Sequence, residues 1–243
     1  MLGPDHPNTL SSRNNLAGAY QAEGDVVRAL ALYEQILADS IRVLGADHPG
    51  TLTSQNNLAF AYESAGDVER ALVLYEQVLA DCDRVLGADS PQTLKCRNNL
   101  AGAYMWTGDV GRALELYEQV LTDCARVLGA DSPQTLMSRN NLAGAYLAMG
   151  DVGRAIPLYE ETLAARLRVL GADHPDTLLS RNNLAGACEA AGDLGRAVPL
   201  CEQALSDCVR VLGTEHSTTV VVRQNLAAMR ARYRDWQFGK STD

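Results

Sequence analysis

An eight-residue motif, Arg-Asn-Asn-Leu-Ala-Gly-Ala-Tyr, recurs at 13–20, 97–104 and 139–146, and with one or two changes at 55–62 and 181–188. Successive copies lie 42 residues apart, and 20 of the 42 positions carry the same residue in all five copies of the surrounding unit. Self-similarity at a fixed period of this length is typical of solenoids, in which each unit packs mainly on its neighbours. We therefore expect one elongated domain built from a single repeated unit.

The repeat also sets the expected boundaries of the domain. We expect it to span 1–236, followed by a short C-terminal tail at 237–243. The units are 2–43, 44–85, 86–127, 128–169 and 170–211, and a sixth unit consists only of a terminal helix at 212–236.

Each unit carries the start and stop signals of two helices. In the first unit Pro7 suits the first helical position, because its missing N–H would have no partner there. Leu16 marks the face of this helix that packs on a neighbouring helix. Gly24 ends the helix, Asp25 caps the next one, and Gly45 ends the second helix. The sequence therefore predicts an all-α fold of antiparallel helix pairs.

Two prolines inside helices and two arginines in the last unit depart from this pattern. Pro157 and Pro199 fall inside the second helix of their units and each removes one backbone hydrogen bond, so we expect a local kink and not a break. In the last unit Arg230 replaces the usual tyrosine and Arg234 replaces the turn glycine. This exchange is typical of the polar cap that ends a solenoid.

The charge balance narrows the class of partner. The chain has 30 acidic and 21 basic side chains, for a net charge of −9, whereas binding to nucleic acid favours a basic face. There is no apolar run long enough to span a membrane and no leader-like N-terminus. We expect a cytoplasmic protein that binds neither nucleic acid nor a membrane.

Charged residues and cysteines give two further expectations. Arg28, Glu34 and Arg42 recur in all five units, which indicates ion pairs between repeats worth about 0–1 kcal/mol each. The six cysteines lack CxxC spacing and are expected to be reduced thiols. Cys188 and Cys201 replace the two tyrosines of the fifth unit, which should loosen it, and their proximity would permit a disulfide under oxidation.

No pattern indicates a cofactor, a metal or a catalytic group. The four histidines, His6, His48, His174 and His216, recur one or more repeats apart, so they cannot converge on one ion and are better explained as helix N-caps. Ser, Cys, Asp and His form no cluster of the kind that hydrolysis needs, and there is no glycine-rich phosphate loop. We expect a protein that is not an enzyme.

The unit resembles the tetratricopeptide repeat. The residues that carry this resemblance are Leu16, Ala17, Tyr20, Gly24, Ala29 and Tyr33, with the same spacing in later units. The 42-residue length, the LGADHPDTL linker and the NNLA motif resemble the kinesin light chain branch, and Arg13 stands in the place of the family's usual tryptophan. The resemblance implies a right-handed superhelix whose first helices line a concave face that grips extended peptides. It implies no catalysis.

The asparagines of the first helices are the main candidates for peptide contact. On a helical wheel Asn14 lies about 160° from Leu16, on the side expected to form the groove. Its series is Asn14, Asn56, Asn98, Asn140 and Asn182, closed by Gln224, and the adjacent flank carries Asn15, Asn57, Asn99, Asn141, Asn183 and Asn225. Amides can pair with any peptide backbone, since each carries donors and an acceptor. The alternative is that they bond each other and set the stacking of the helices.

Positions that vary between units are expected to give specificity. Phe60 stands where other units have glycine, and Met105 and Trp106 stand where they have smaller or polar residues, which indicates an apolar anchor pocket. Lys95 would pair with an acidic residue of the ligand. The alternative for Trp106 is that it folds over the end of its helix onto a neighbour.

Two functions remain open on these observations. The first is a non-enzymatic scaffold that binds an extended peptide or protein. The second is a regulatory or self-association module of a larger protein, which would stack through the uncapped N-terminal face of the first repeat. Concentration-dependent light scattering separates them.

Overall fold

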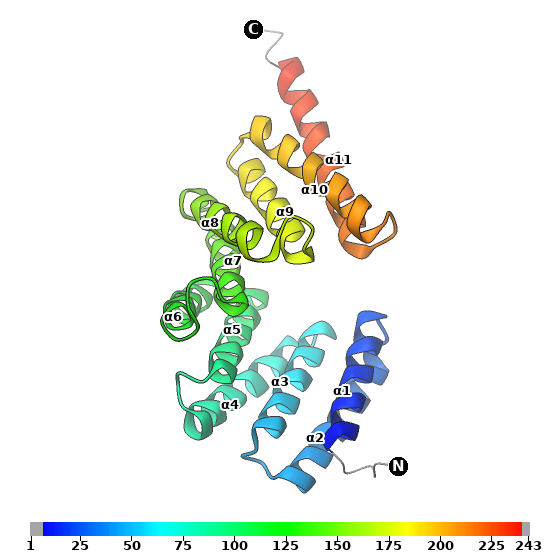
Figure 1. Ribbon diagram of the computed structural model, residues 1–243, viewed down its shortest axis with the longest axis vertical. Helices are drawn as coiled ribbons and strands as arrows, with labels where there is room; N and C mark the ends of the chain where they lie inside the picture. Colours follow the sequence, from blue (N-terminus) through cyan, green and yellow to red (C-terminus); the bar gives the residue numbers. More distant parts are fainter. Residues whose placement is uncertain (1–6, 240–243) are drawn as a thin grey trace. The chain divides into compact units, whose positions relative to one another are not determined.

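A computed structural model describes residues 7–239, and His6, one of the expected N-caps, lies outside them. The described chain is helical, with short loops between helices (Figure 1). The helices are α1 (Pro7–Ala22), α2 (Val26–Leu44), α3 (Pro49–Ser64), α4 (Val68–Leu86), α5 (Pro91–Trp106), α6 (Val110–Leu128), α7 (Pro133–Ala148), α8 (Val152–Leu170), α9 (Pro175–Ala190), α10 (Leu194–Leu212) and α11 (Ser217–Gly239). This confirms the all-α fold of helix pairs.

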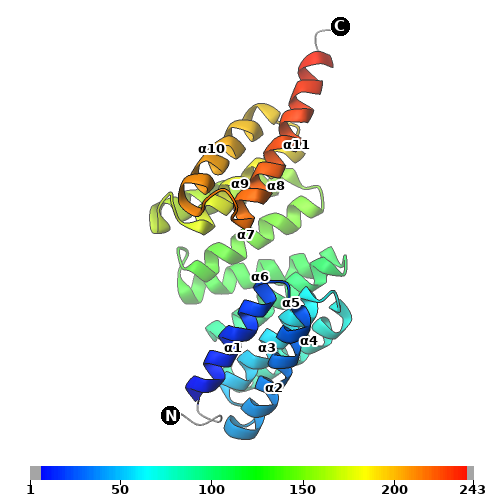
Figure 2. The same cartoon turned by 90° about the vertical axis from the view of Figure 1, so that its right-hand side faces the viewer.

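Each repeat contributes an A helix with an odd number and a B helix with an even number, and α11 is the A helix of the last repeat. Contacts divide the chain into two compact units, Met1–Val127 and Leu128–Asp243, and the division falls in the sequence between the third and fourth repeats. We call them unit 1 and unit 2. Successive helices lie side by side from α1 to α5 within unit 1 and from α7 to α11 within unit 2 (Figure 2).

Local sequence explains where the helices begin and end. Nδ1 of His48 accepts the Gly50 N–H at 3.0 Å, and Ser90 Oγ accepts the Gln92 N–H at 3.2 Å, so these residues are N-caps in front of a proline. His174 and His216 cap their helices in the same way. The A helices of the five full repeats are each followed by a turn glycine with positive φ, such as Gly24 at 81°, which favours a residue without a Cβ.

The core lies where A and B helices of neighbouring repeats meet. Ala17, Ala29, Tyr33 and Ile36 of the first repeat pack with Leu58 of the second, and all are buried. The equivalent of Leu58 in the first repeat, Leu16, is 47% exposed. Leu16 was expected to pack on a helix. In later repeats the equivalent leucine packs against the preceding repeat, and no described helix precedes α1.

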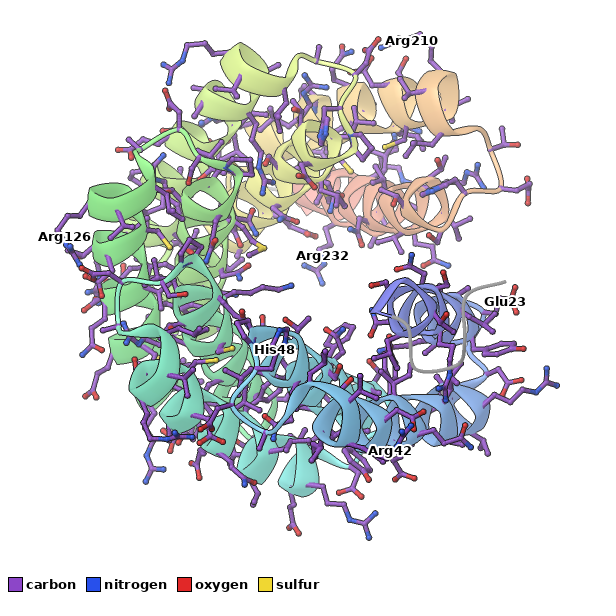
Figure 3. The ribbon with its side chains drawn as sticks, turned by 60° about the horizontal axis from the view of Figure 1, so that its bottom comes forward. Glu23, Arg42, His48, Arg126, Arg210 and Arg232 are labelled. Atoms are coloured by element: carbon purple, nitrogen blue, oxygen red, sulfur yellow. The ribbon has the colours of Figure 1, made fainter. Side chains whose placement is uncertain are left out.

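Ion pairs link the edges of adjacent repeats, as expected for the Arg42 series. Arg84 on α4 grips the two carboxylate oxygens of Asp47 at 2.6 and 3.2 Å, and equivalent pairs recur at Arg126 and Arg210. Figure 3 shows Arg126 and Arg210 projecting into solvent from the ribbon of their own units. Since these pairs are exposed, each contributes little to stability.

Arg166 on α8 is a buried charge of a different kind. Its side chain is 7% exposed and takes the position that Ser40 holds in the first repeat. The guanidinium donates to Ser180 Oγ at 2.8 Å and to the Asp176 carbonyl at 2.9 Å. No carboxylate among the described residues pairs with it within 4.0 Å, and burial lowers its pKa.

The two internal prolines and the last helix complete the description. α8 and α10 continue through Pro157 and Pro199, so neither proline breaks its helix. α11 runs to Gly239, three residues beyond the end expected from the sequence. Within residues 7–239 no helix combines the length and apolar character needed to cross a membrane.

Candidate functional site: the A-helix face

The A-helix face is the surface formed by the repeat positions of Ser11, Asn14, Gly18, Gln21 and Ala22. On it, asparagines of neighbouring A helices hydrogen-bond each other. Nδ2 of Asn57 donates to Oδ1 of Asn14 at 2.9 Å. The same pairing joins other residues 43 apart: Asn99 to Asn56 at 3.0 Å, Asn183 to Asn140 at 3.1 Å, and Asn225 to Asn182 at 3.2 Å.

These hydrogen bonds correspond to the alternative expectation, in which the asparagines bond each other across neighbouring A helices. Asn56, Asn98 and Asn182 are buried, whereas Asn14, Asn140 and the flank residues Asn57, Asn99 and Asn141 are half-buried. A pair such as Asn14 and Asn57 uses one acceptor and one donor, and each amide has further capacity. Hydrogen bonding between these remaining amide donors and acceptors and a bound peptide stays a prediction.

Glycine in the A helix makes room for a tyrosine hydroxyl that reaches across from the B helix. A Cβ on Gly102 would lie 3.5 Å from the Tyr117 hydroxyl, and one on Gly144 would lie 3.3 Å from the Tyr159 hydroxyl. Burial raises the pKa of both tyrosines to about 12, so they stay neutral donors. The hydroxyls therefore occupy part of the space that these glycines leave beside the asparagines.

Phe60 changes this arrangement in the second repeat. The glycine is absent there, and the Tyr75 hydroxyl donates to Glu63 Oε2 at 3.0 Å instead. Burial raises the pKa of the Glu63 carboxyl, although hydrogen bonding by Tyr75 and Trp106 lowers it in part. Glu63 thus lies between a buried tyrosine of its own repeat and Trp106 of the next.

Trp106 lies beside Glu63 of the preceding A helix and is largely open to solvent. Its indole interacts with Glu63, on the neighbouring A helix, yet the side chain is 72% exposed. Phe60, one helical turn before Glu63, is 50% exposed. Trp106 therefore presents a large aromatic surface, and its role as an anchor for a ligand stays a prediction.

The contact between Glu63 and Trp106 belongs to a second row of contacts 43 residues apart. In the first pair of repeats, Gln21 Nε2 donates to Ser64 Oγ at 2.6 Å. At the end of unit 2, Arg232 forms an ion pair with Glu189 at 2.9 Å. Figure 3 shows Arg232 on the side of α11 away from α10.

The position of Ser11 carries exposed residues that sequence reasoning identified only in part. Lys95 is exposed, and Met105, one position before Trp106, is half-buried. In unit 2 the equivalents of Lys95 are Met137, Leu179 and Val221, of which Leu179 is 39% and Val221 50% exposed. The sequence interpretation missed Leu179 and Val221. The signal was present, because the last three repeats all carry an apolar residue at this position.

The structure brings together a cysteine pair that the sequence did not suggest. Cys82 on α4 and Cys96 on α5 are buried, with their sulfurs 3.4 Å apart. Cys201 instead contacts the Asn182 side chain and the Val222 carbonyl, and both Cys188 and Cys201 are free thiols. Within residues 7–239, no three His, Cys, Asp or Glu side chains are placed to hold a metal ion.

Comparisons with known proteins agree with this geometry. A family model described as "Tetratricopeptide repeat" matches residues 8–84, 57–104, 97–168 and 139–206. A kinesin-light-chain-type protein of Podosopora anserina with nearly identical TPR-like repeats is 38% identical, with a TM-score of 0.67, over 87% of this chain and 99% of that chain. A point variant of it is 37% identical, with a TM-score of 0.69, over 86% and 98%.

A third solved structure, BtubC (BKLC) from P. vanneervenii, is 25% identical, with a TM-score of 0.70, over 86% of this chain and 84% of that chain. No curated protein matches the chain.

Proposed function

Since the chain belongs to the tetratricopeptide-repeat family, whose repeats generally mediate protein–protein interaction, we propose that it is a non-enzymatic scaffold that binds an extended segment of a partner protein on the A-helix face of unit 1. The observation that carries this proposal is the exposure of Trp106 and Phe60 on neighbouring A helices. Other repeats fold with alanine and glycine at these positions, so neither ring is needed for the repeat to fold.

Large aromatic side chains that are held in place yet exposed are typical of the anchors that dominate binding energy. The Trp106 indole lies beside Glu63, and a contact with this carboxyl would limit the freedom of the indole and so reduce the entropy lost when a ligand covers it. An apolar side chain of the partner would pack between Trp106 and Phe60.

The amide pairs support the same proposal through the backbone of the ligand. In the pair of Asn56 and Asn99, one hydrogen bond fixes the orientation of both amides. A fixed row of donors and acceptors suits an extended peptide, whose N–H and C=O groups recur along its length. Lys95 is exposed beside this row and would favour an acidic residue in the bound segment.

A peptide-library screen with matched variants tests this function. Trp106→Ala introduces the residue of the first, fourth and fifth repeats, and Phe60→Gly introduces the residue of the other four full repeats. Both variants should therefore keep the fold while weakening binding of a selected peptide about tenfold or more. Val27→Ala, which shortens an exposed apolar residue on a B helix, is the control and should leave binding unchanged. Asn98→Ala tests the amide row. Full binding by all three A-helix variants would refute the proposal.

A second candidate is self-association through α1. Ser12, Asn15, Leu16 and Ala19 are all exposed on one face, whereas the equivalents of Ser12, Leu16 and Ala19 in the second repeat are buried against the preceding repeat. A second copy would cover this face, including the exposed Leu16 side chain. Light scattering that shows a concentration-independent monomer, unchanged by Leu16→Glu, would remove this candidate.

A further inference from the structure

A cavity of about 550 Å³ opens between α1 and α3. Its lining includes His48, which is labelled in Figure 3. Ser11 and Asn14 line it from α1, and Thr53 and Ser54 line it from α3. Its floor includes Ile36 of α2, which is buried. The cavity therefore combines an apolar floor with hydroxyl and amide walls.

The next repeat shows what normally occupies part of this space. There Gln92 on α5 extends across to α3, where its Nε2 donates to the Pro49 carbonyl at 2.9 Å and to Thr53 Oγ1 at 3.1 Å. One repeat earlier, the residue equivalent to Gln92 is Gly50, and the residue equivalent to Thr53 is Ser11. The second repeat thus lacks the side chain that would bridge it to the first, and Gly50 and Ser11 both line the cavity.

We propose that this cavity binds a primary carboxamide side chain, of the glutamine type, that projects from the extended segment of the partner. The partner's amide would replace the one that Gly50 lacks, with its N–H groups donating to Ser11 Oγ. Oδ1 of Asn14 already accepts a hydrogen bond from Asn57, so the amide nitrogen of Asn14 is the group that donates to the incoming carbonyl. Ile36 would pack against the methylene groups.

The lining favours a neutral polar side chain over a charged one. His48 is the one residue with an ionisable side chain among those that line the cavity, and its Nδ1 is engaged by the Gly50 N–H. A carboxylate or an ammonium group would lose hydration there without gaining a partner of opposite charge. Glutamine is therefore preferred to glutamate, and the hydroxyl and amide walls prefer it to leucine.

The inference rests on the proposed function for the source of the side chain, but its test does not need the natural partner. The probe is N-acetyl-glutamine amide, titrated into isotope-labelled protein while backbone and side-chain NMR signals are recorded. N-acetyl-glutamate amide and N-acetyl-leucine amide are the comparison probes. The wild type should show saturable shifts at Ser11, Asn14 and Thr53 with the glutamine probe, and weaker shifts with the other two.

Two substitutions at one position supply the matched control. Gly50→Gln restores the residue found at Gln92 and should abolish the shifts by filling the cavity. Gly50→Ala introduces the same Cβ, which would lie 3.1 Å from His48 Nδ1 and 3.2 Å from a Leu44 methyl group, but it cannot reach across the cavity. The fifth repeat has Asp176 after the same His-Pro pair, so a side chain is compatible with a histidine cap at this point.

Gly50→Ala should therefore keep the shifts that Gly50→Gln loses. Equal shifts in Gly50→Gln, equal binding of the leucine or glutamate probe, or no saturable shift in the wild type would each overturn the inference. Because Trp106 and Phe60 take no part in this titration, failure here leaves the proposed peptide-binding function standing.

Discussion

Two equivalent glycines, replaced one at a time by alanine, should show how much a nearby tyrosine hydroxyl reduces the gain in stability that alanine brings to a helix. Gly144 and Gly186 occupy the same position in α7 and α9 of unit 2. A Cβ on Gly144 would lie 3.3 Å from the Tyr159 hydroxyl, whereas a Cβ on Gly186 would have nothing within 4 Å, because Cys201 replaces the tyrosine there. The fifth repeat therefore has the unfilled space that the loss of the ring predicts.

Replacing glycine by alanine inside a helix stabilises it by roughly 1 kcal/mol where the methyl group fits. Gly186→Ala should gain about this amount and raise the melting temperature by about 2–4 °C. Gly144→Ala should gain roughly nothing, because Tyr159 must shift by a few tenths of an ångström. Thermal and urea unfolding of the two variants gives the comparison, and the control is the double variant Gly144→Ala with Tyr159→Phe, which should recover part of the gain. Equal stabilisation by the two alanines would refute this reasoning.

Three further outcomes follow from polar groups that are buried or half-buried. Glu63→Gln should stabilise the protein at pH 7 and not at pH 4. The pKa of Glu63 is raised in the folded protein, so the folded state favours the protonated carboxyl, and this stabilisation is lost as pH rises through that pKa. Melting curves recorded between pH 4 and pH 7 check this prediction. Arg166→Met should raise the free energy of unfolding by about 1 kcal/mol, because it removes a buried charge without a carboxylate partner, and an unchanged or lower urea midpoint would contradict this. Diamide, which takes up two electrons and two protons as two thiols form a disulfide, should link Cys82 to Cys96, and peptide mapping that finds any other pair first would count against the geometry.

The sequence alone predicted most of the local structure because each boundary depends on neighbouring residues. Pro49 with His48 begins a helix, and Asp25 after Gly24 begins the next, so the bounds of the helices followed from caps and turns. The repeat multiplied each signal five times, which made the assignment secure.

The face of each A helix was harder to predict, because a helical wheel treats one helix in isolation. It placed Asn56 in the groove, but a neighbouring helix brings Asn99 against it and buries it. The same limitation hid the contact of Cys82 with Cys96, since the distance between a B helix and the following A helix is not a property of either helix. Leu16 looked like a core residue because its copies are, and it is exposed because no described helix precedes α1.

The lateral contacts of the A helices have a consequence for how this surface acquires specificity. Gln21 meets Ser64, and Glu63 meets Trp106, each 43 residues later, so a side chain is held by the repeat before its own. A tryptophan placed at Ala190 would face Leu147, which cannot accept a hydrogen bond from the indole. The same ring would then be free to collapse onto its own helix instead of being presented. Under the proposed function, recognition by this surface would therefore depend on adjacent pairs of repeats, and among the described residues the second and third repeats are the pair that places an exposed tryptophan beside a carboxylate.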